Sequence, residues 1–238
     1  MTVVGCSPAW PNPGGAQSGY LVESEGARLL LDCGPGVLAR LRALKDWPRI
    51  DSIAITHLHL DHWGDLVPWV WGSLFGPGES LPKPELWLPP GSREQLRPVL
   101  ATLGTEDMFD RAFEVSEYEA RVPFAVAGLE VTAVPVDHYA IPAFGFRVKG
   151  DRVLAYSGDS GPSEALAELA QNADLLLSEA TLEIGGYDGP DRGHLSPAEV
   201  TEAVADARAL RVVLTHRPVE RDPPPGFELV YDGLELEF

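Results

Sequence analysis

The 238-residue sequence predicts an α/β protein in which two mixed sheets are faced by helices. Short apolar, β-branched runs alternate with helical patterns at both ends of the chain. Between residues 111 and 156, successive strand patterns follow one another with turn signals between them. No linker, low-complexity segment or internal repeat divides the chain, so residues 1–238 are expected to form a single domain.

The first half of the chain predicts a hairpin followed by strand-to-helix steps. Glu25-Gly26 is the turn of the hairpin, and Pro35 is expected in the first turn of the next helix, where its missing N–H is unpaired anyway. Pro68 signals a break in a later helix. In order, the predicted elements are strands 18–24 and 27–36, helix 35–46, strand 51–57, helix 63–75, and a strand then a helix over 84–104.

The second half predicts a strand-rich block, and then helices alternating with strands. Lys149-Gly150-Asp151 is a tight turn, and Ser196 with Glu199 forms a capping box. The tail alternates apolar and polar residues around Asp232-Gly233, which predicts a hairpin. The predicted elements are strands 111–117, 122–128, 129–138, 144–150 and 152–160, helix 162–172, strand 173–180, helix 196–210, strand 211–216 and hairpin 227–238.

Composition restricts the partners and the compartment. The formal charge of −18 and the absence of a basic run disfavour large nucleic acids as partners, because the field of the protein repels polyanions. Cys6 and Cys33 have no CxxC spacing, so we expect free thiols in a reducing compartment. The sequence contains no leader and no long apolar segment, which predicts a cytoplasmic protein without a membrane partner.

The segment "THLHLDHWGD" at residues 56–65 concentrates potential metal ligands. Closely spaced His and Asp are typical of metal sites. All six histidines, and also Asp159, lie at the ends of predicted strands or in the loops that follow, where residues distant in sequence can converge at one edge. The histidines are His57, His59, His62, His138, His194 and His216.

Local geometry predicts two ions at this segment. His57 and His59 point the same way in an extended chain and can bind one ion. Asp61 and His62 can face a neighbouring position if the chain turns into a helix there. A carboxylate such as Asp159 could bridge both cations. Imidazole and carboxylate ligands favour Zn²⁺, with Mn²⁺ or Fe²⁺ as alternatives.

The order "THLHLDH", "PVDH", "SGDS" and "LTHRP" resembles the metallo-β-lactamase superfamily over nearly the whole chain. The resemblance implies a four-layer αβ/βα sandwich with mixed sheets and a metal centre at one edge. It also implies a role for Asp32, which matches an acidic residue that supports a ligand, although a simple turn residue is an open alternative. The implied ligands are His57, His59 and His138 for the first ion, Asp61, His62 and His216 for the second, and Asp159 for both.

A dinuclear centre predicts a hydrolase, because two ions about 3.5–4 Å apart can share a hydroxide and hold a phosphoryl or carbonyl oxygen. Asp61 could accept the proton of the attacking water. His194 is the histidine left over for protonating the leaving oxygen, and Glu179 could orient it. A surface histidine without this role is the alternative.

The segments around Glu179 and His194 resemble loops of the tRNase Z branch. Ser178 replaces a histidine of that branch, and the long Gly-rich insertion is missing, so pre-tRNA 3' processing is the second hypothesis. The segments "GDLVPWVWG" and "PPPGFELVYDGLELEF" are similar to the cyclic phosphodiesterase of the carbon-phosphorus lyase pathway, although the cysteines of its additional zinc site are missing.

We therefore predict a phosphodiesterase that acts on small or cyclic nucleotide-like diesters. A lactone or ester hydrolase and a homodimer stay open. His59 stands where a di-iron redox relative usually has a glutamate, which disfavours that class. Trp63, Trp69 and Trp71 are expected mainly in the core, with stacking in the cleft as the alternative. Arg217 has no assigned role.

Overall fold

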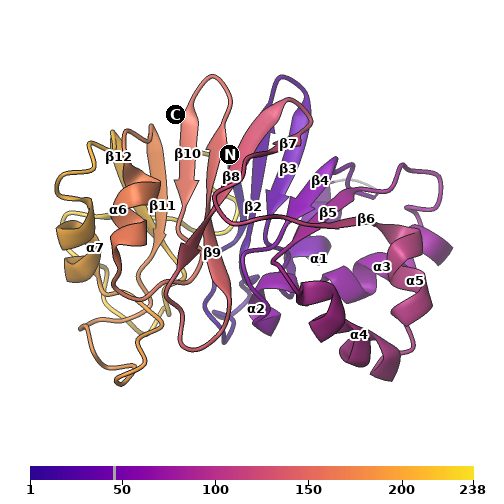
Figure 1. The fold of residues 1–238 in the computed structure, drawn as a ribbon, viewed down its shortest axis with the longest axis horizontal. Coiled ribbons are helices and arrows are strands. Elements are labelled where there is room, and N and C mark those ends of the chain that lie inside the picture. Colours follow the sequence, from indigo (N-terminus) through magenta and orange to yellow (C-terminus); the bar gives the residue numbers. More distant parts are fainter. Residues whose placement is uncertain (45–46) are drawn as a thin grey trace.

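The computed structural model describes residues 1–44 and 47–238, and it consists of two packed sheets with helices on both outer faces (Figure 1). Helices α1, α3, α4 and α5 lie outside the first sheet, and helices α6 and α7 lie outside the second. The predicted α/β sandwich is confirmed. Folding of residues 1–238 as a single domain stays a prediction.

The first sheet has six strands in the order β1-β2-β3-β4-β5-β6. β1 to β3 are antiparallel, and β3 to β6 are parallel, so the predicted hairpin with its Glu25-Gly26 turn is confirmed. The elements of this half are β1 (Thr2–Gly5), β2 (Gly19–Ser24), β3 (Ala27–Leu31), α1 (Val37–Leu44), β4 (Ser52–Ala54), α2 (Leu60–Trp63), α3 (Leu66–Phe75), β5 (Glu85–Leu88), α4 (Ser92–Thr102), α5 (Glu106–Ala112) and β6 (Glu114–Glu117).

The second sheet has seven strands in the order β13-β12-β11-β10-β9-β8-β7. β7 to β10 are antiparallel, with the predicted turn between β9 and β10, and β10 to β13 are parallel. The elements are β7 (Phe124–Val126), β8 (Leu129–Val136), β9 (Ala143–Lys149), β10 (Val153–Tyr156), α6 (Glu164–Ala170), β11 (Leu175–Glu179), α7 (Pro197–Val204), β12 (Arg211–Thr215) and β13 (Glu228–Leu229).

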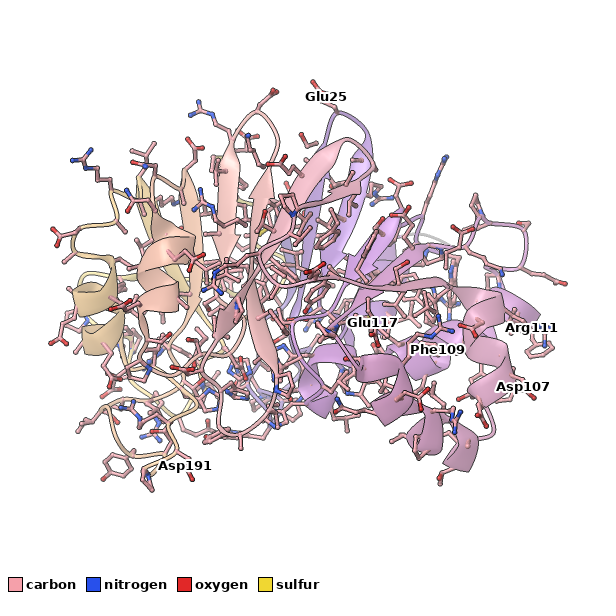
Figure 2. The ribbon with its side chains drawn as sticks, in the orientation of Figure 1. Glu25, Asp107, Phe109, Arg111, Glu117 and Asp191 are labelled. Atoms are coloured by element: carbon pink, nitrogen blue, oxygen red, sulfur yellow. The ribbon has the colours of Figure 1, made fainter. Side chains whose placement is uncertain are left out.

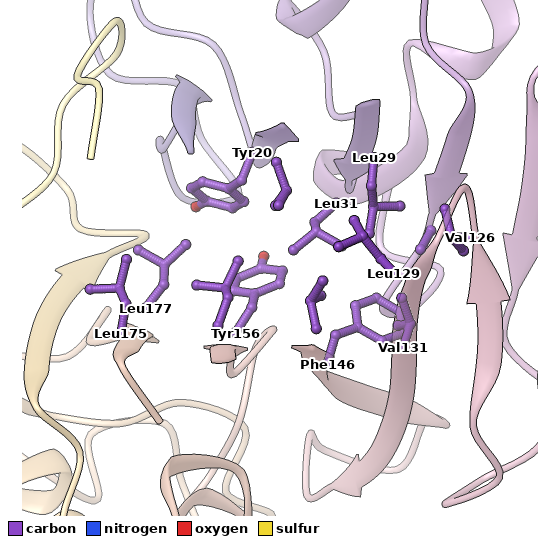
Figure 3. Close-up of a cluster of buried hydrophobic side chains, with 14 of the residues drawn as sticks. Tyr20, Leu29, Leu31, Val126, Leu129, Val131, Phe146, Tyr156, Leu175 and Leu177 are labelled. Carbon is purple, nitrogen blue, oxygen red and sulfur yellow. The ribbon is translucent and has the colours of Figure 1, made fainter. Parts of the chain in front are cut away.

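The core between the sheets follows the alternation of side chains along each strand. Leu29 and Leu31 point into the space between the sheets, whereas Leu30 packs against the helices outside. At the centre of this core, the rings of Tyr20 and Tyr156 approach to 4.9 Å between centroids (Figure 3). Both faces of the strands are therefore buried, which explains their continuous apolar runs.

Two prolines behave differently from the sequence predictions. Pro68 does not break α3, because it is the third residue of that helix and its missing N–H falls in the first turn. Pro35 precedes α1 instead of forming its first turn, since Gly36 adopts a left-handed conformation with φ of 94° and the helix begins at Val37. The predicted end of that helix at residues 45–46 lies outside the described residues.

Two further predictions were wrong. Helix α5 was missed, and the strand predicted from Arg111 begins only at Glu114. The tail has the predicted Asp232-Gly233 turn but does not form a hairpin, because β13 pairs with β12. The residues after the turn bond to the N-terminus instead: Val3 N donates to Leu234 O, and Leu236 N donates to Met1 O. The strand β1, which was not predicted, supplies the partner that the tail needed.

The two ends of the sandwich differ. Glu25, in the β2–β3 turn, lies at one end, and Asp191, in the loop before α7, lies at the other (Figure 2). Helix α2 lies at the same end as Asp191, and both chain termini lie toward the Glu25 end (Figure 1). Within the described residues, no helix has the length and apolar character needed to cross a membrane.

Candidate metal centre

All nine side chains predicted to form the site lie at the α2 end of the sandwich. They come from seven chain segments, most of which follow strands of the two sheets. The prediction that every histidine lies in a strand end or loop is wrong for His62, which is in α2. The positions are His57 and His59 after β4, Asp61 and His62 on α2, His138 after β8, Asp159 after β10, Glu179 at the end of β11, His194 before α7 and His216 after β12.

The first group consists of His57, His59 and His138. One ligand atom from each lies within 4.8 Å of the others. His138 Nε2 and His59 Nδ1 are 2.8 Å apart, and the rings of His57 and His59 are 4.8 Å apart, so the two histidines of the "HLH" segment do face the same side. Three imidazole nitrogens therefore converge on one point.

The second group consists of Asp61, His62, Asp159 and His216, all of them buried. His62 Nε2 lies 3.4 Å from both Asp61 Oδ2 and Asp159 Oδ2, and His216 Nε2 lies 3.5 Å from Asp159 Oδ1. Asp159 Oδ2 also lies 3.9 Å from the Nε2 atoms of His57 and His138 in the first group. Asp159 thus faces both groups.

Unpaired buried atoms show that these groups suit cations. His57 Nε2, His62 Nε2 and Asp159 Oδ1 have no hydrogen-bond partner among the described residues. Buried polar atoms normally have partners, and all three of these point into the histidine and aspartate cluster. Imidazole nitrogens with carboxylate oxygens are ligands for Zn²⁺, Mn²⁺ or Fe²⁺. The donor set therefore fits divalent metal ions.

The charge states of most of these groups suit ligands. Burial lowers the pKa of His57, of His59 and of His138, which keeps these imidazoles neutral. Burial of Asp159 alone would raise its pKa, but the neighbouring His216 and His62 hold that pKa well below its usual value. His62 differs, because the surrounding aspartates outweigh its burial and hold its pKa well above the usual value. Neutral imidazoles and ionised carboxylates are the forms that bind metals, so a cation bound at His62 would displace a proton.

Asp32 holds His62 in place. Its buried carboxylate lies 2.7 Å from His62 Nδ1 and accepts hydrogen bonds from Thr56 N and from the Tyr156 hydroxyl, both at 2.8 Å. With Nδ1 held against Asp32, the ring of His62 directs Nε2 toward Asp159. Asp32 therefore orients His62, and its role in supporting a metal ligand, which the sequence resemblance implied, stays a prediction.

Two threonines support other histidines, and the sequence analysis missed both. The Thr56 hydroxyl lies 3.1 Å from His57 Nδ1, and the Thr181 hydroxyl lies 2.8 Å from His216 Nδ1. His138 Nδ1 lies 2.6 Å from the carbonyl of Gly193. The adjacency of Thr56 to "HLHLDH" and of Thr181 to Glu179 is the signal that could have identified them.

His194 and Glu179 form a pair beside the two groups. His194 Nδ1 lies 3.0 Å from Glu179 Oε1 and 4.0 Å from Asp159 Oδ2. Thr181 and the backbone N–H groups of Ser160 and Leu195 also donate to the Glu179 carboxylate, which fixes its orientation. Burial lowers the pKa of His194, but the charge and hydrogen bond of Glu179, together with the charges of Asp159 and Asp188, outweigh burial and raise this pKa to about 9. The surrounding carboxylates therefore favour the protonated form of His194.

The remaining candidates lie apart from the metal-binding atoms. Trp63 and Trp69 are buried in the core between the first sheet and its helices, whereas Trp71 is exposed and packs on Phe75. Arg217 is buried and donates to the carbonyls of the 180–182 segment and of Asp222. Its guanidinium thus braces the backbone beside the site.

Comparisons with known proteins agree with this architecture. The model of the "Beta-lactamase superfamily domain" matches residues 27–217. A probable metallo-hydrolase, YhfI of Bacillus subtilis, is 30% identical over 223 residues, 92% of this chain and 86% of that protein. A ribonuclease Z of Mycobacterium bovis is 30% identical over 193 residues, which are 74% and 68% of the two chains.

Two solved structures have the same fold. The crystal structure of YhfI superposes with a TM-score of 0.82 at 22% identity and covers 98% of this chain and 96% of that one. The short form of human tRNase Z superposes with a TM-score of 0.73 at 28% identity, and the match covers 98% of this chain and 95% of that one.

Proposed function

Because the chain belongs to the metallo-β-lactamase superfamily, in which its relatives include metallo-hydrolases, we propose that it is a metal-dependent phosphodiesterase acting on small or cyclic nucleotide-like diesters. His57, His59 and His138 would hold one divalent ion, and Asp61, His62 and His216 a second. Asp159 would contact both ions. Zn²⁺ is the ion that this donor set favours, with Mn²⁺ and Fe²⁺ as alternatives.

When bound, such ions would supply an activated water and offset the negative charge of the phosphoryl group. The side chains of the protein handle the protons. Asp61 would accept the proton of the attacking water, and its Oδ2, which faces the cluster at 3.2 Å from His216 Nε2, supports this role. His194 would donate a proton to the leaving oxygen, with Glu179 orienting its ring, and the 3.0 Å contact between the two side chains supports this role.

The observation that carries this proposal is the His194–Glu179 pair beside Asp159. An alkoxide is a poor leaving group and needs a proton, whereas a nitrophenolate does not. A proton donor fixed beside a candidate dinuclear centre therefore supports cleavage of diesters with poor leaving groups. It is less useful for esters with good leaving groups, such as phenolic esters. A lactone also expels an alkoxide, so a lactone hydrolase stays the alternative.

Leaving-group dependence tests the proposal. Purified protein would be assayed under Zn²⁺ and under Mn²⁺ with bis-p-nitrophenyl phosphate and with 2',3'-cyclic nucleotides. We expect metal-dependent turnover of both, and we expect His194→Ala to slow cyclic nucleotide hydrolysis about 100-fold to 10,000-fold, with little effect on the nitrophenyl diester. Equal losses on both substrates, or no turnover of any diester, would refute it.

A second candidate is tRNase Z-type processing of pre-tRNA 3' ends. The 30% identity to a ribonuclease Z favours it. The charge of −18 opposes it, and so does Ser178, which is buried and donates to the Glu179 carbonyl where that branch has a histidine. Incubation with a trailer-bearing transcript separates the two, because only the second candidate predicts cleavage at the trailer.

A further inference from the structure

Several exposed apolar side chains lie close in sequence to residues of the candidate metal centre. Each is within five positions of a residue of the site: Leu60, Tyr139, Ile184 and Val219. An exposed apolar side chain beside a functional site is a candidate contact for a ligand. Of these side chains, Tyr139 is the one whose ring packs against rings of the site.

Tyr139 lies directly beside the proposed proton donor. Its ring centroid is 4.9 Å from that of His138 and 5.6 Å from that of His194. The ring is edge-on to His194, at 81° between planes, and 42% of the residue stays exposed to solvent. An aromatic ring with a free surface is therefore adjacent to the group that would protonate the leaving oxygen.

The backbone holds this ring in one position. Tyr139 N donates to the Arg192 carbonyl at 3.2 Å, and Gly193 lies against the ring so closely that any Cβ at that position would overlap it. Tyr139 also has a φ of 48°, in the left-handed region that a bulky side chain rarely adopts. Such strain persists where the surrounding structure imposes it, and it concentrates at functional sites.

We propose that Tyr139 is a positioning residue that stacks against a planar aromatic moiety of the substrate, a nucleobase on the half of the diester that His194 protonates. This inference rests on the proposed function, because it names the class of substrate for that same site. The ring is already ordered, so little side-chain entropy is lost when a base stacks on it. Stacking on an aromatic side chain is tolerant of base identity, and its loss weakens binding about 5-fold to 150-fold per base.

Substrate pairs with and without a base test the inference. Metal-loaded wild type, Tyr139→Phe, Tyr139→Leu and the matched control Tyr187→Leu would be compared on 2',3'-cyclic adenosine monophosphate and on the base-free ribose 2,3-cyclic phosphate. We expect Tyr139→Leu to raise KM for the nucleotide about 5-fold or more while kcat stays within about 2-fold. Tyr139→Phe and Tyr187→Leu should match the wild type, and the base-free substrate should not distinguish the four proteins.

A stability measurement separates stacking from a structural role. Asparagine tolerates the left-handed conformation, so Tyr139→Asn should keep or raise the Tm and still lose the preference for the nucleotide. Equal losses on both cyclic phosphates, or a Tyr139→Leu enzyme that keeps the full preference, would overturn the inference.

A measurement of ligand binding keeps the inference testable if the protein hydrolyses no diester. Calorimetry on metal-loaded protein would compare adenosine 5'-monophosphate with ribose 5-phosphate. Stacking predicts tighter binding of the nucleotide in the wild type and loss of that difference in Tyr139→Leu. Equal affinity of the wild type for both ligands would overturn the inference, whatever reaction the protein catalyses.

Discussion

Asp32→Asn probes how the buried carboxylate behind His62 sets the metal centre. The carboxylate accepts from Thr56 N, Tyr156 OH and His62 Nδ1 at 2.7–2.8 Å. An asparagine that keeps its oxygen on Thr56 N turns its NH₂ toward the other two groups. His62 must then accept at Nδ1, which moves its proton to Nε2, the atom that faces Asp159.

These contacts set the expected loss of stability and of metal affinity. With the amide oxygen on Thr56 N, the Tyr156 hydroxyl loses its acceptor; with the amide flipped, Thr56 N loses its acceptor. One buried donor is therefore unpaired in either orientation, at a cost of about 1–3 kcal/mol in unfolding free energy. Loss of the hydrogen bond that orients a ligand histidine lowers metal affinity about 10-fold to 100-fold. This corresponds to about 1.4–2.7 kcal/mol of binding free energy.

The assay combines a chelator competition with urea unfolding of the apoprotein. Asp51→Asn is the matched control, because Asp51 is a half-buried carboxylate that accepts from Arg28 N, and an amide oxygen can replace it there. We expect the control to match the wild type in both measurements. An Asp32→Asn protein with unchanged metal affinity and unchanged apoprotein stability would refute the role assigned to Asp32.

Three other perturbations follow from the described contacts. Metal at about 100 times its Kd should add about 2.7 kcal/mol to the unfolding free energy and about 5–10 °C to the Tm in a thermal melt, and an equal Tm for protein stripped of metal would contradict this. Ser196→Ala removes the capping box of α7 and should cost about 0.5–2 kcal/mol in urea unfolding, whereas Ser196→Asp should restore most of it. Leu177→Ala, between the sheets, should lower the free energy of unfolding by about 2–5 kcal/mol, whereas Leu210→Ala, at an exposed position, should lower it by less than about 0.5 kcal/mol. Similar losses for the two variants would contradict the assigned core.

The convergence of the site residues could be predicted because the evidence for it is local. His57, His138 and His216 each follow a short apolar strand, and the ends of strands in stacked sheets meet at one edge. For Asp61 and His62 the sequence analysis stated only what would follow if the chain turned into a helix there, and α2 supplies that helix.

What could not be predicted depends on contacts between distant residues. The tail has the alternation and the Asp-Gly turn of a hairpin, but its partner is β1, more than 220 residues earlier. Helix α5 has only seven residues, too few for a clear helical period. The left-handed backbone of Tyr139 could not be predicted from the sequence around it, because its contacts with Arg192 and Gly193 lie more than 50 residues later in the chain.

The pairing of the tail with β1 brings the two chain ends together, since the Met1 amino group donates to the Leu236 carbonyl at 2.8 Å. Head-to-tail ligation through a short linker should therefore close the polypeptide into a ring without distorting it. The junction would lie at the end of the sandwich opposite α2 (Figure 1). Protein tethered to a solid support through either end would keep its histidine-rich edge open to the surrounding liquid.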